Sequence, residues 1–199
     1  MPDLDNSPLI VGIGGTALPQ SSTESALRLA LDVAARKGAR TRLLNGAALV
    51  ALPHYGALDS NEEHGSDLIA AVRAADGLII ASPGYHGSIS GLVKNAIDYL
   101  EETARDTRPY LDGLPVGLIA TAYGWQATGS TLAALRSIVH ALRGWPTPLG
   151  LALNTSAGLF KDGVCTDPAA QAQLELLGSQ VVDFAEMRRE WRDRSEEAA

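Results

Sequence analysis

Three short segments of this sequence gather residues whose types and spacing could bind a ligand. The first covers residues 12–24 and carries four hydroxyl side chains: Thr16, Ser21, Ser22 and Thr23. They surround a predicted helix start, where free N–H groups and the positive end of the helix dipole favour a phosphate. We therefore expect a cradle for one phosphate group. The alternative for Ser21 or Ser22 is that its hydroxyl only caps the helix.

The second segment is SPGYHGSIS, residues 82–90. Its proline and glycines allow the backbone to turn sharply and to approach a flat ligand closely, so that peptide groups can bond the edge of a heterocycle. The residues that we expect to form this contact are Pro83, Gly84, Tyr85, His86, Gly87 and Ser88. The alternative is ordinary packing for Tyr85 and a solvated position for His86.

The third segment, residues 121–130, places Tyr123 and Trp125 on either side of Gly124. Large apolar side chains beside backbone donors suit a planar ring system, and we expect these three residues to contact one. The alternative for Trp125 is an anchor that fixes the segment to the next helix or lies in a subunit contact.

Motifs for other chemistries are absent from the sequence, which has no G-x-S-x-G elbow, no P-loop and no H-x-x-x-H or C-x-x-C metal spacing. Gly12, Gly14 and Ala17 fit the loose dinucleotide pattern G-x-G-x-x-A, but no acidic residue follows the second predicted strand to bind a ribose. We expect no catalytic side chain and no metal. The pattern favours a bound cofactor that supplies the chemistry, and flavin mononucleotide (FMN) has one phosphate, one polar ring edge and one large flat face.

Short apolar runs alternate with amphipathic stretches and predict the elements that position these segments. The predicted strands are Leu9–Ile13, Thr41–Leu44, Gly77–Ala81, Pro115–Thr121 and Leu149–Leu153. Helices are predicted near Ser22, over Leu68–Val72, from Ser90 to Leu100, over Thr131–Leu142 and from about Pro168, with a long polar loop through Pro53, His54, Tyr55 and residues 59–61. The alternation predicts a doubly wound, five-stranded parallel α/β sheet. In such sheets ligands bind beyond the carboxyl ends of the strands, and all three segments follow a strand.

Composition limits the class of protein. The chain has 199 residues, 46% of them hydrophobic, and a net charge of −7. This length predicts a single domain over residues 1–199, with frayed tails at 1–7 and 192–199. The acidity argues against nucleic acid and anionic lipid as partners, and no apolar run approaches the roughly 20 residues of a membrane span. With a single cysteine and no basic, apolar leader, we expect a cytoplasmic protein.

Two stretches, GIGGTALPQSSTESAL and SPGYHGSISGLVKNAIDYLE, resemble the NADPH-dependent FMN reductase family. Its pattern P-x-Y-x-x-S-x-x-G-x-x-K-N-x-x-D-x-L is matched by Pro83, Tyr85, Ser88, Gly91, Lys94, Asn95, Asp98 and Leu100. The resemblance runs from about Leu9 to Asn154. It implies a flavodoxin-like fold with strand order 2-1-3-4-5, FMN at the strand ends, and reduction by NADPH or NADH. It also implies homodimers or homotetramers that bury the helix after the second segment.

One departure from the family lies in the phosphate loop. The family's G-S-x-R-x-x-S-x-N-like loop has an arginine near the position of Leu18, which is apolar. Loss of a charge-assisted contact of about 1.5–3 kcal/mol would weaken phosphate binding. The resemblance then implies that FMN is a loosely held substrate rather than a fixed prosthetic group.

The function implied by the resemblance is NAD(P)H-dependent FMN reduction. A nicotinamide passes hydride to flavin N5, and reduced flavin passes electrons to a small acceptor or to a partner monooxygenase. One alternative is an NAD(P)H:quinone or azo reductase with tightly bound FMN. Another is a flavodoxin-type electron carrier without NAD(P)H activity, and a third is a redox-inactive relative that keeps the fold as a scaffold.

Overall fold

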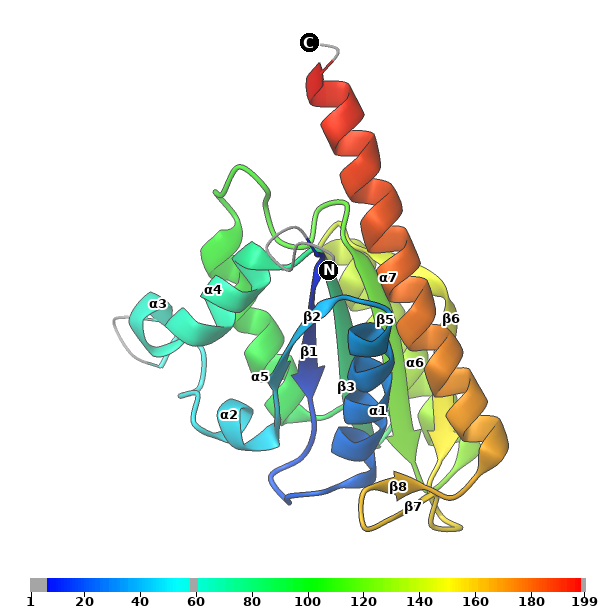
Figure 1. Ribbon diagram of the computed structural model, residues 1–199. Helices are drawn as coiled ribbons and strands as arrows, with labels where there is room; N and C mark the ends of the chain where they lie inside the picture. The colour runs from blue at the N-terminus through cyan, green and yellow to red at the C-terminus, as the bar shows by residue number, and fades with distance from the viewer. Residues whose placement is uncertain (1–6, 58–60, 198–199) are drawn as a thin grey trace.

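The computed structural model describes residues 7–57 and 61–197 and shows a parallel sheet between two layers of helices (Figure 1). The parallel strands are β1 (Leu9–Gly14), β2 (Arg40–Leu44), β3 (Gly77–Tyr85), β5 (Pro115–Ala122) and β6 (Trp145–Asn154), in the order β2-β1-β3-β5-β6. The predicted parallel α/β sheet is therefore present. Five parallel strands are present as predicted, and the short strand β4 (Ser88–Ile89), which was not predicted, pairs antiparallel with the end of β3. A separate hairpin of β7 (Phe160–Lys161) and β8 (Val164–Cys165) follows β6.

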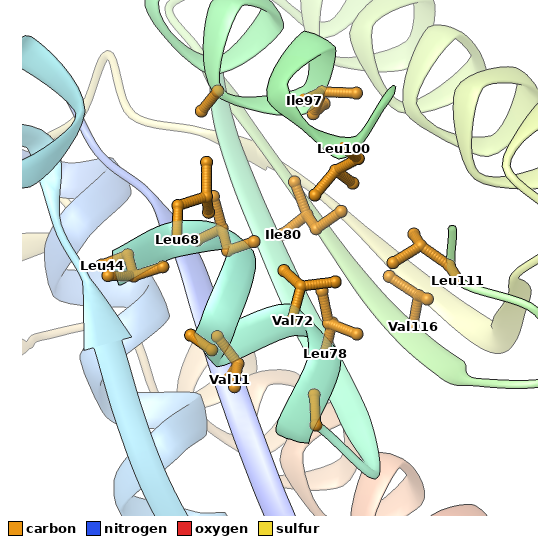
Figure 2. Packing of buried hydrophobic residues seen from close by; sticks show 14 of the residues in the cluster. Val11, Leu44, Leu68, Val72, Leu78, Ile80, Ile97, Leu100, Leu111 and Val116 are labelled. Atoms are coloured by element: carbon orange, nitrogen blue, oxygen red, sulfur yellow. The ribbon is translucent and has the colours of Figure 1, made fainter. Parts of the chain in front are cut away.

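Side chains alternate between the two faces of the sheet and form two cores. Ile10 and Ile79 pack on one face with the helices α1 (Ser22–Arg36) and α7 (Pro168–Glu197). Val11 and Ile80 pack on the other face, which is covered by α4 (Ser66–Ala74), α5 (Gly91–Asp98), α6 (Trp125–Ala141) and the 3-10 helix η2 (Tyr99–Thr103). Figure 2 shows part of this second core, where Val11, Leu78 and Ile80 of the strands meet Leu68 and Val72 of α4. Strands buried on both faces explain the continuous apolar runs of the sequence.

Three predicted elements differ from the structure. The stretch predicted as a polar loop contains two short helices, α2 (Gly46–Val50) and α3 (Asn61–His64). The Asn45 side chain caps α2 by accepting a hydrogen bond from the N–H of Ala48 (3.1 Å). Residues 59 and 60 of that predicted loop lie outside the described residues.

The other two differences concern helix ends. Helix α6 begins at Trp125 instead of Thr131, because the Thr128 amide already bonds the carbonyl of Gly124 (3.0 Å). Helix α7 continues to Glu197, through most of the stretch predicted as a frayed tail. Its last turns are rich in arginine and glutamate, which have high helix propensity. Of the predicted tail at residues 1–7, only Ser7 is described.

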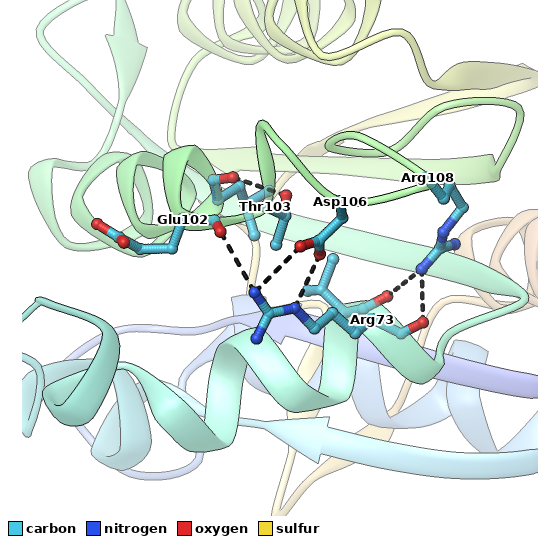
Figure 3. Close-up of polar contacts among 7 residues, drawn as sticks. Arg73, Glu102, Thr103, Asp106 and Arg108 are labelled. Atoms are coloured by element: carbon cyan, nitrogen blue, oxygen red, sulfur yellow. Dashed lines mark hydrogen bonds and ion pairs between the residues drawn. The ribbon is translucent and has the colours of Figure 1, made fainter.

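A polar network closes the amino end of the sheet (Figure 3). The Arg108 guanidinium donates to the carbonyl oxygens of Val72 (2.6 Å), Arg73 (2.8 Å) and Ala75 (2.9 Å) at the end of α4, where helical carbonyl groups run out of intrahelical donors. Arg73 Nε pairs with Asp106 Oδ2 at 2.8 Å. Burial lowers the pKa of Arg108, and the nearby Arg188 guanidinium lowers it further. This network ties α4 to the chain that leads into β5.

Among the residues described, none of the helices combines the length and the apolar character that crossing a bilayer requires.

Candidate functional site

The structure brings the three predicted segments to one edge of the sheet, the carboxyl ends of β1, β3 and β5, at the bottom of Figure 1. Glycines allow the first segment to pass very close to its neighbours. A Cβ atom on Gly14 would lie 2.1 Å from the carbonyl oxygen of Ala81 at the end of β3. One on Gly46 would lie 1.8 Å from the carbonyl oxygen of Thr16. The loop after β1 is therefore held between β3 and the start of α2.

The four hydroxyls of the first segment have different surroundings. Ser21 caps α1, because its oxygen accepts a hydrogen bond from the N–H of Glu24 (3.3 Å), and a contact of its hydroxyl with a phosphate stays a prediction. Thr23 is buried, and its hydroxyl shares a 2.7 Å hydrogen bond with the hydroxyl of Thr121. Thr16 Oγ1 bonds both the N–H and the carbonyl of Leu18. Only Ser22, in the first turn of α1, has a hydroxyl without a hydrogen-bond partner among the residues that the structure describes.

An ion pair that we did not predict lies beside this loop. Glu24 is only 6% exposed, and its Oε1 accepts from both Nε (2.9 Å) and Nη2 (2.7 Å) of Arg28. The Glu24 side chain therefore bonds Arg28, while the Glu24 backbone N–H bonds the Ser21 cap. These two residues line a hollow with Pro19, Gln20, Ser25, Asn45 and Gly163. The i, i+4 spacing of glutamate and arginine was the available sequence signal.

The second segment is a β-hairpin rather than an irregular loop. β3 runs on through Pro83 and Gly84 to Tyr85, which pairs with Ser88 of β4. The two turn residues, His86 (φ 52°) and Gly87 (φ 90°), have the positive φ angles of a type I′ turn. The buried Ser82 hydroxyl accepts from the N–H of Ser90 (3.0 Å) and ties the base of the hairpin to the start of α5. The backbone that we expect to meet a ring edge is thus rigidly supported.

Close packing against α6 fixes the other side of this hairpin. A Cβ atom on Gly84 would lie 2.5 Å from the hydroxyl oxygen of Thr131 and 3.2 Å from the carbonyl oxygen of Ala127. The Thr131 hydroxyl donates to the carbonyl of Ser88 (3.3 Å). The sequence prediction missed Thr131, because a threonine inside a helical pattern carries no distinguishing signal.

The third segment is shorter than predicted. Only Tyr123 and Gly124 connect β5 to α6, and Trp125 is the first residue of that helix. Tyr123 is 81% exposed, Trp125 70% and Tyr85 54%. Exposed aromatic side chains from two strand ends therefore share this edge of the sheet, which suits a planar ligand. The segment after β6 also reaches this edge, since the N–H of Thr155 bonds the carbonyl of Ala122 (2.8 Å), and the sequence prediction did not include it.

The motif residues of α5 have structural roles in this chain. Asn95 accepts from the N–H of Tyr55 (2.8 Å) and donates to the carbonyl of Pro53 (3.0 Å). Tyr55 in turn donates to Glu102 Oε1 (2.9 Å), and burial together with this carboxylate raises its pKa to about 12. Lys94 and Asp98 form the i, i+4 ion pair that their spacing predicts. These contacts fasten the chain before α3 to α5 and η2.

The residues at this end of the sheet fit FMN, except that the loop facing the phosphate has no positively charged side chain. The edge offers a helix N-terminus with Ser22, a rigid hairpin backbone and exposed aromatic faces. Residues 15–23 contain no lysine, arginine or histidine to meet a phosphate. Leu18 lies in the middle of this loop and is 74% exposed.

A doubly wound parallel sheet with the strand order β2-β1-β3-β5-β6 defines a flavodoxin-like α/β fold. Solved structures have the same fold. One is FerB, a flavoenzyme NAD(P)H:(acceptor) oxidoreductase from Paracoccus denitrificans, with a TM-score of 0.73 and 21% sequence identity. The match covers 90% of this chain and 98% of FerB. A flavodoxin, WrbA-like protein from Agrobacterium tumefaciens has a TM-score of 0.62 at 16% identity, covering 91% and 99%. The family model for NADPH-dependent FMN reductase matches residues 8–158, and the chain belongs to this family.

A curated relative is more similar in sequence. The chain is 35% identical over 130 residues to an FMN-dependent NADPH-azoreductase of Staphylococcus aureus (strain USA300). This match covers 64% of the chain and 65% of the azoreductase, slightly less than two thirds of that relative's length.

Proposed function

We propose that this chain is an NAD(P)H-dependent FMN reductase. The observation that carries the proposal is the meeting of a rigid hairpin and three exposed aromatic side chains at the carboxyl edge of the sheet, in a chain that belongs to this family. The redox chemistry at this end of the sheet would be supplied by FMN, as the acceptor of hydride from the nicotinamide and the donor of electrons to an acceptor. The protein supplies binding and orientation.

Each part of the edge has a proposed role toward FMN. The α1 N-terminus, with Ser21 and Ser22 and the neighbouring Thr16 and Thr23, receives the phosphate. The hairpin backbone bonds the ring edge through Pro83, Gly84, Tyr85, His86, Gly87 and Ser88. Tyr123, Gly124 and Trp125 cover one ring face, and the open side admits the nicotinamide. The buried bond between Thr23 and Thr121 supports a positioning role for Thr23, because its hydroxyl is already engaged.

The proposal also covers the oligomeric state of the chain, its electron acceptors and its location in the cell. We propose that residues 1–199 act as one FMN-binding domain that forms homodimers or homotetramers through the exposed side of α5. The electrons pass to a small acceptor or a partner monooxygenase. Cys165, the one cysteine of the chain, lacks a disulfide partner, which supports a cytoplasmic location.

A second candidate function is azo or quinone reduction with retained FMN. It is favoured by the 35% identity to the FMN-dependent NADPH-azoreductase. The two candidates differ in the fate of the flavin, because an azoreductase keeps FMN through turnover whereas a flavin-supplying reductase releases it. Gel filtration of the FMN-loaded chain separates them: flavin that elutes with the protein favours the azoreductase, and flavin that elutes separately favours the flavin reductase.

NADPH oxidation measured with and without added FMN tests the proposal. We expect oxidation that requires FMN and saturates with it. If the chain neither binds FMN nor oxidises NADPH or NADH in its presence, the proposed function is wrong and the fold serves another purpose.

A further inference from the structure

We infer that this chain recognises flavins mainly by their ring system and that the 5′-phosphate of FMN adds little, so that riboflavin is bound and reduced nearly as well as FMN. The inference rests on the proposed function and names its substrate class more closely. Three independent features of the loop at residues 15–23 carry it: its lack of charge, the hydrogen bonds of its hydroxyls, and the ion pair of a cation beside it.

The loop offers no positive side chain to a dianionic phosphate. Residues 15–23 contain no lysine, arginine or histidine, and an exposed leucine, Leu18, stands where the family's loop arginine would fall. A charge-assisted hydrogen bond is roughly twice as strong as a neutral one. The loop therefore lacks the contact that most favours a phosphate over a neutral hydroxyl group.

Three of the four loop hydroxyls already bond within the protein. Thr16 bonds both backbone groups of Leu18, Ser21 caps α1, and Thr23 is paired with Thr121 in the interior. A phosphate that recruited the Thr16 proton would first break its bond to the Leu18 carbonyl, and the net gain per exchanged hydrogen bond is small. Ser21, whose oxygen only accepts in its cap, and Ser22 remain with the α1 N-terminus as the main donors.

Arg28, a cation that lines a hollow beside the loop, is neutralised. Arg28 points toward the first turn of α1, but two of its N–H groups bond the same oxygen of Glu24. Glu24 is buried, and its second carboxylate oxygen lies 3.6 Å from the position that a Cβ on Gly15 would occupy. The Glu24–Arg28 pair therefore contributes no net charge beside the loop, and Glu24, the anion, is the buried residue of the two. Any electrostatic attraction for phosphate is limited to the partial charge of the helix end.

The aromatic edge, in contrast, is independent of the phosphate. Tyr85, Tyr123 and Trp125 are all more than half exposed and lie after β3 and β5, not after β1. Stacking and burial of the ring system supply affinity to riboflavin and FMN alike. The ratio of the two affinities therefore isolates the contribution of the phosphate.

The test is a fluorescence titration of the full-length chain with riboflavin and with FMN. The inference predicts dissociation constants that differ by less than about tenfold, equivalent to about 1.4 kcal/mol. FMN binding that is tighter by tenfold or more overturns it while leaving the proposed function intact. If neither flavin binds, the proposed function itself fails, and the inference fails with it.

Substitutions at Leu18 test the missing charge. Leu18→Arg is expected to tighten FMN at least about tenfold, because it adds a charge-assisted contact, and to leave riboflavin within twofold. Leu18→Gln, equally exposed but neutral, is the matched control and should change neither. Equal effects of Leu18→Arg on both flavins, or an effect on neither, contradict the inference.

Substitutions in the ion pair test the neutralised cation. Glu24→Gln frees the Arg28 guanidinium and should raise the preference for FMN over riboflavin. Arg28→Met leaves the carboxylate uncompensated and should lower that preference. Riboflavin binding reports in both variants whether the site is still folded. If the two substitutions shift the preference in the same direction, or leave it unchanged, the pair does not govern the charge of the loop.

Discussion

The two ends of the same parallel sheet are built in opposite ways. At the amino end, polar groups are paired: Arg108 bonds three carbonyl groups at the end of α4, and Asp76 accepts from the N–H of Leu9 (2.9 Å). At the carboxyl end, Tyr85, Tyr123 and Trp125 leave most of their surface exposed. The comparison supports the proposal that one end stabilises the fold and that the other binds the flavin. Substitutions at the two ends should therefore affect different measurements.

The largest expected effect is on ligand binding at the carboxyl end. Gly84→Val places a side chain within 2.5 Å of the Thr131 hydroxyl oxygen and must push the hairpin away from α6. We expect FMN affinity to fall at least about 100-fold, because a shift of about 1 Å in a positioned group can have an effect of that size. Fluorescence titration measures the affinity, and circular dichroism checks the fold.

The matched control for Gly84→Val is Gly129→Ala in α6. A Cβ atom on Gly129 meets nothing within 4 Å, so this variant should bind FMN as the wild type does. Wild-type affinity in Gly84→Val would remove the hairpin from the ligand site.

The next largest effect is on stability, at the amino end. Arg108→Met removes the guanidinium that donates to the carbonyls of Val72, Arg73 and Ala75 and should lower the free energy of unfolding by about 2–4 kcal/mol. FMN affinity should change less than twofold. Urea denaturation provides the stability, and Arg105→Met, at an exposed neighbouring arginine, is the control. The contrast between the two ends fails if Arg108→Met weakens FMN binding and leaves stability unchanged.

A smaller effect on stability is expected at Thr23, which lies in the loop of the candidate site but bonds a buried hydroxyl of the core. Thr23→Val leaves the buried Thr121 hydroxyl without its partner and should cost about 1–2 kcal/mol of stability. The double variant Thr23→Val/Thr121→Val should recover part of this loss, which a double-mutant cycle in urea measures. The ratio of riboflavin to FMN affinity should stay constant. A change in that ratio would assign the Thr23 hydroxyl to the phosphate instead.

The smallest effect concerns pH and lies away from both ends. Tyr55 has its pKa raised from 10.0 to about 12 by burial and by Glu102, so the folded state retains a proton that the unfolded state loses. Its contribution to stability is complete below pH 10 and declines as the pH rises from 10 to 12. Tyr55→Phe should flatten this part of the stability profile and cost about 0.5–1.5 kcal/mol at neutral pH. An unchanged slope between wild type and variant would show that Tyr55 ionises normally.

Much of the architecture could be predicted from the sequence. Runs such as GLIIA and PVGLIAT are buried on both faces, and this pattern specified β3 and β5 and the class of fold. Ser21 was predictable as a cap because its signal is local. The early start of α6 at Trp125 was not, because Gly124 and Gly129 resemble loop residues in the sequence, whereas the helix there is fixed by packing against the hairpin.

The sequence predicted which segments form the candidate site, but not the hydrogen bonds that their side chains make. The ends of β1, β3 and β5 were correctly expected to meet, because parallel strands share one carboxyl edge. Which hydroxyls are free was not predictable, because the partner of Thr23 is Thr121, 98 residues away in the sequence. The Glu24–Arg28 ion pair was also only partly predictable. Its i, i+4 spacing is visible in the sequence, but the burial of Glu24 beside residues 15–23 depends on the fold.

The most direct test of the contrast between the two ends is an amide chemical-shift titration of the isotope-labelled chain with FMN. We expect the largest changes at residues 83–88 and 123–125 with FMN and with riboflavin alike, changes at residues 15–23 mainly with FMN, and no changes at residues 106–113 at the amino end. Changes concentrated at residues 106–113, with the hairpin unaffected, would contradict the placement of the flavin site.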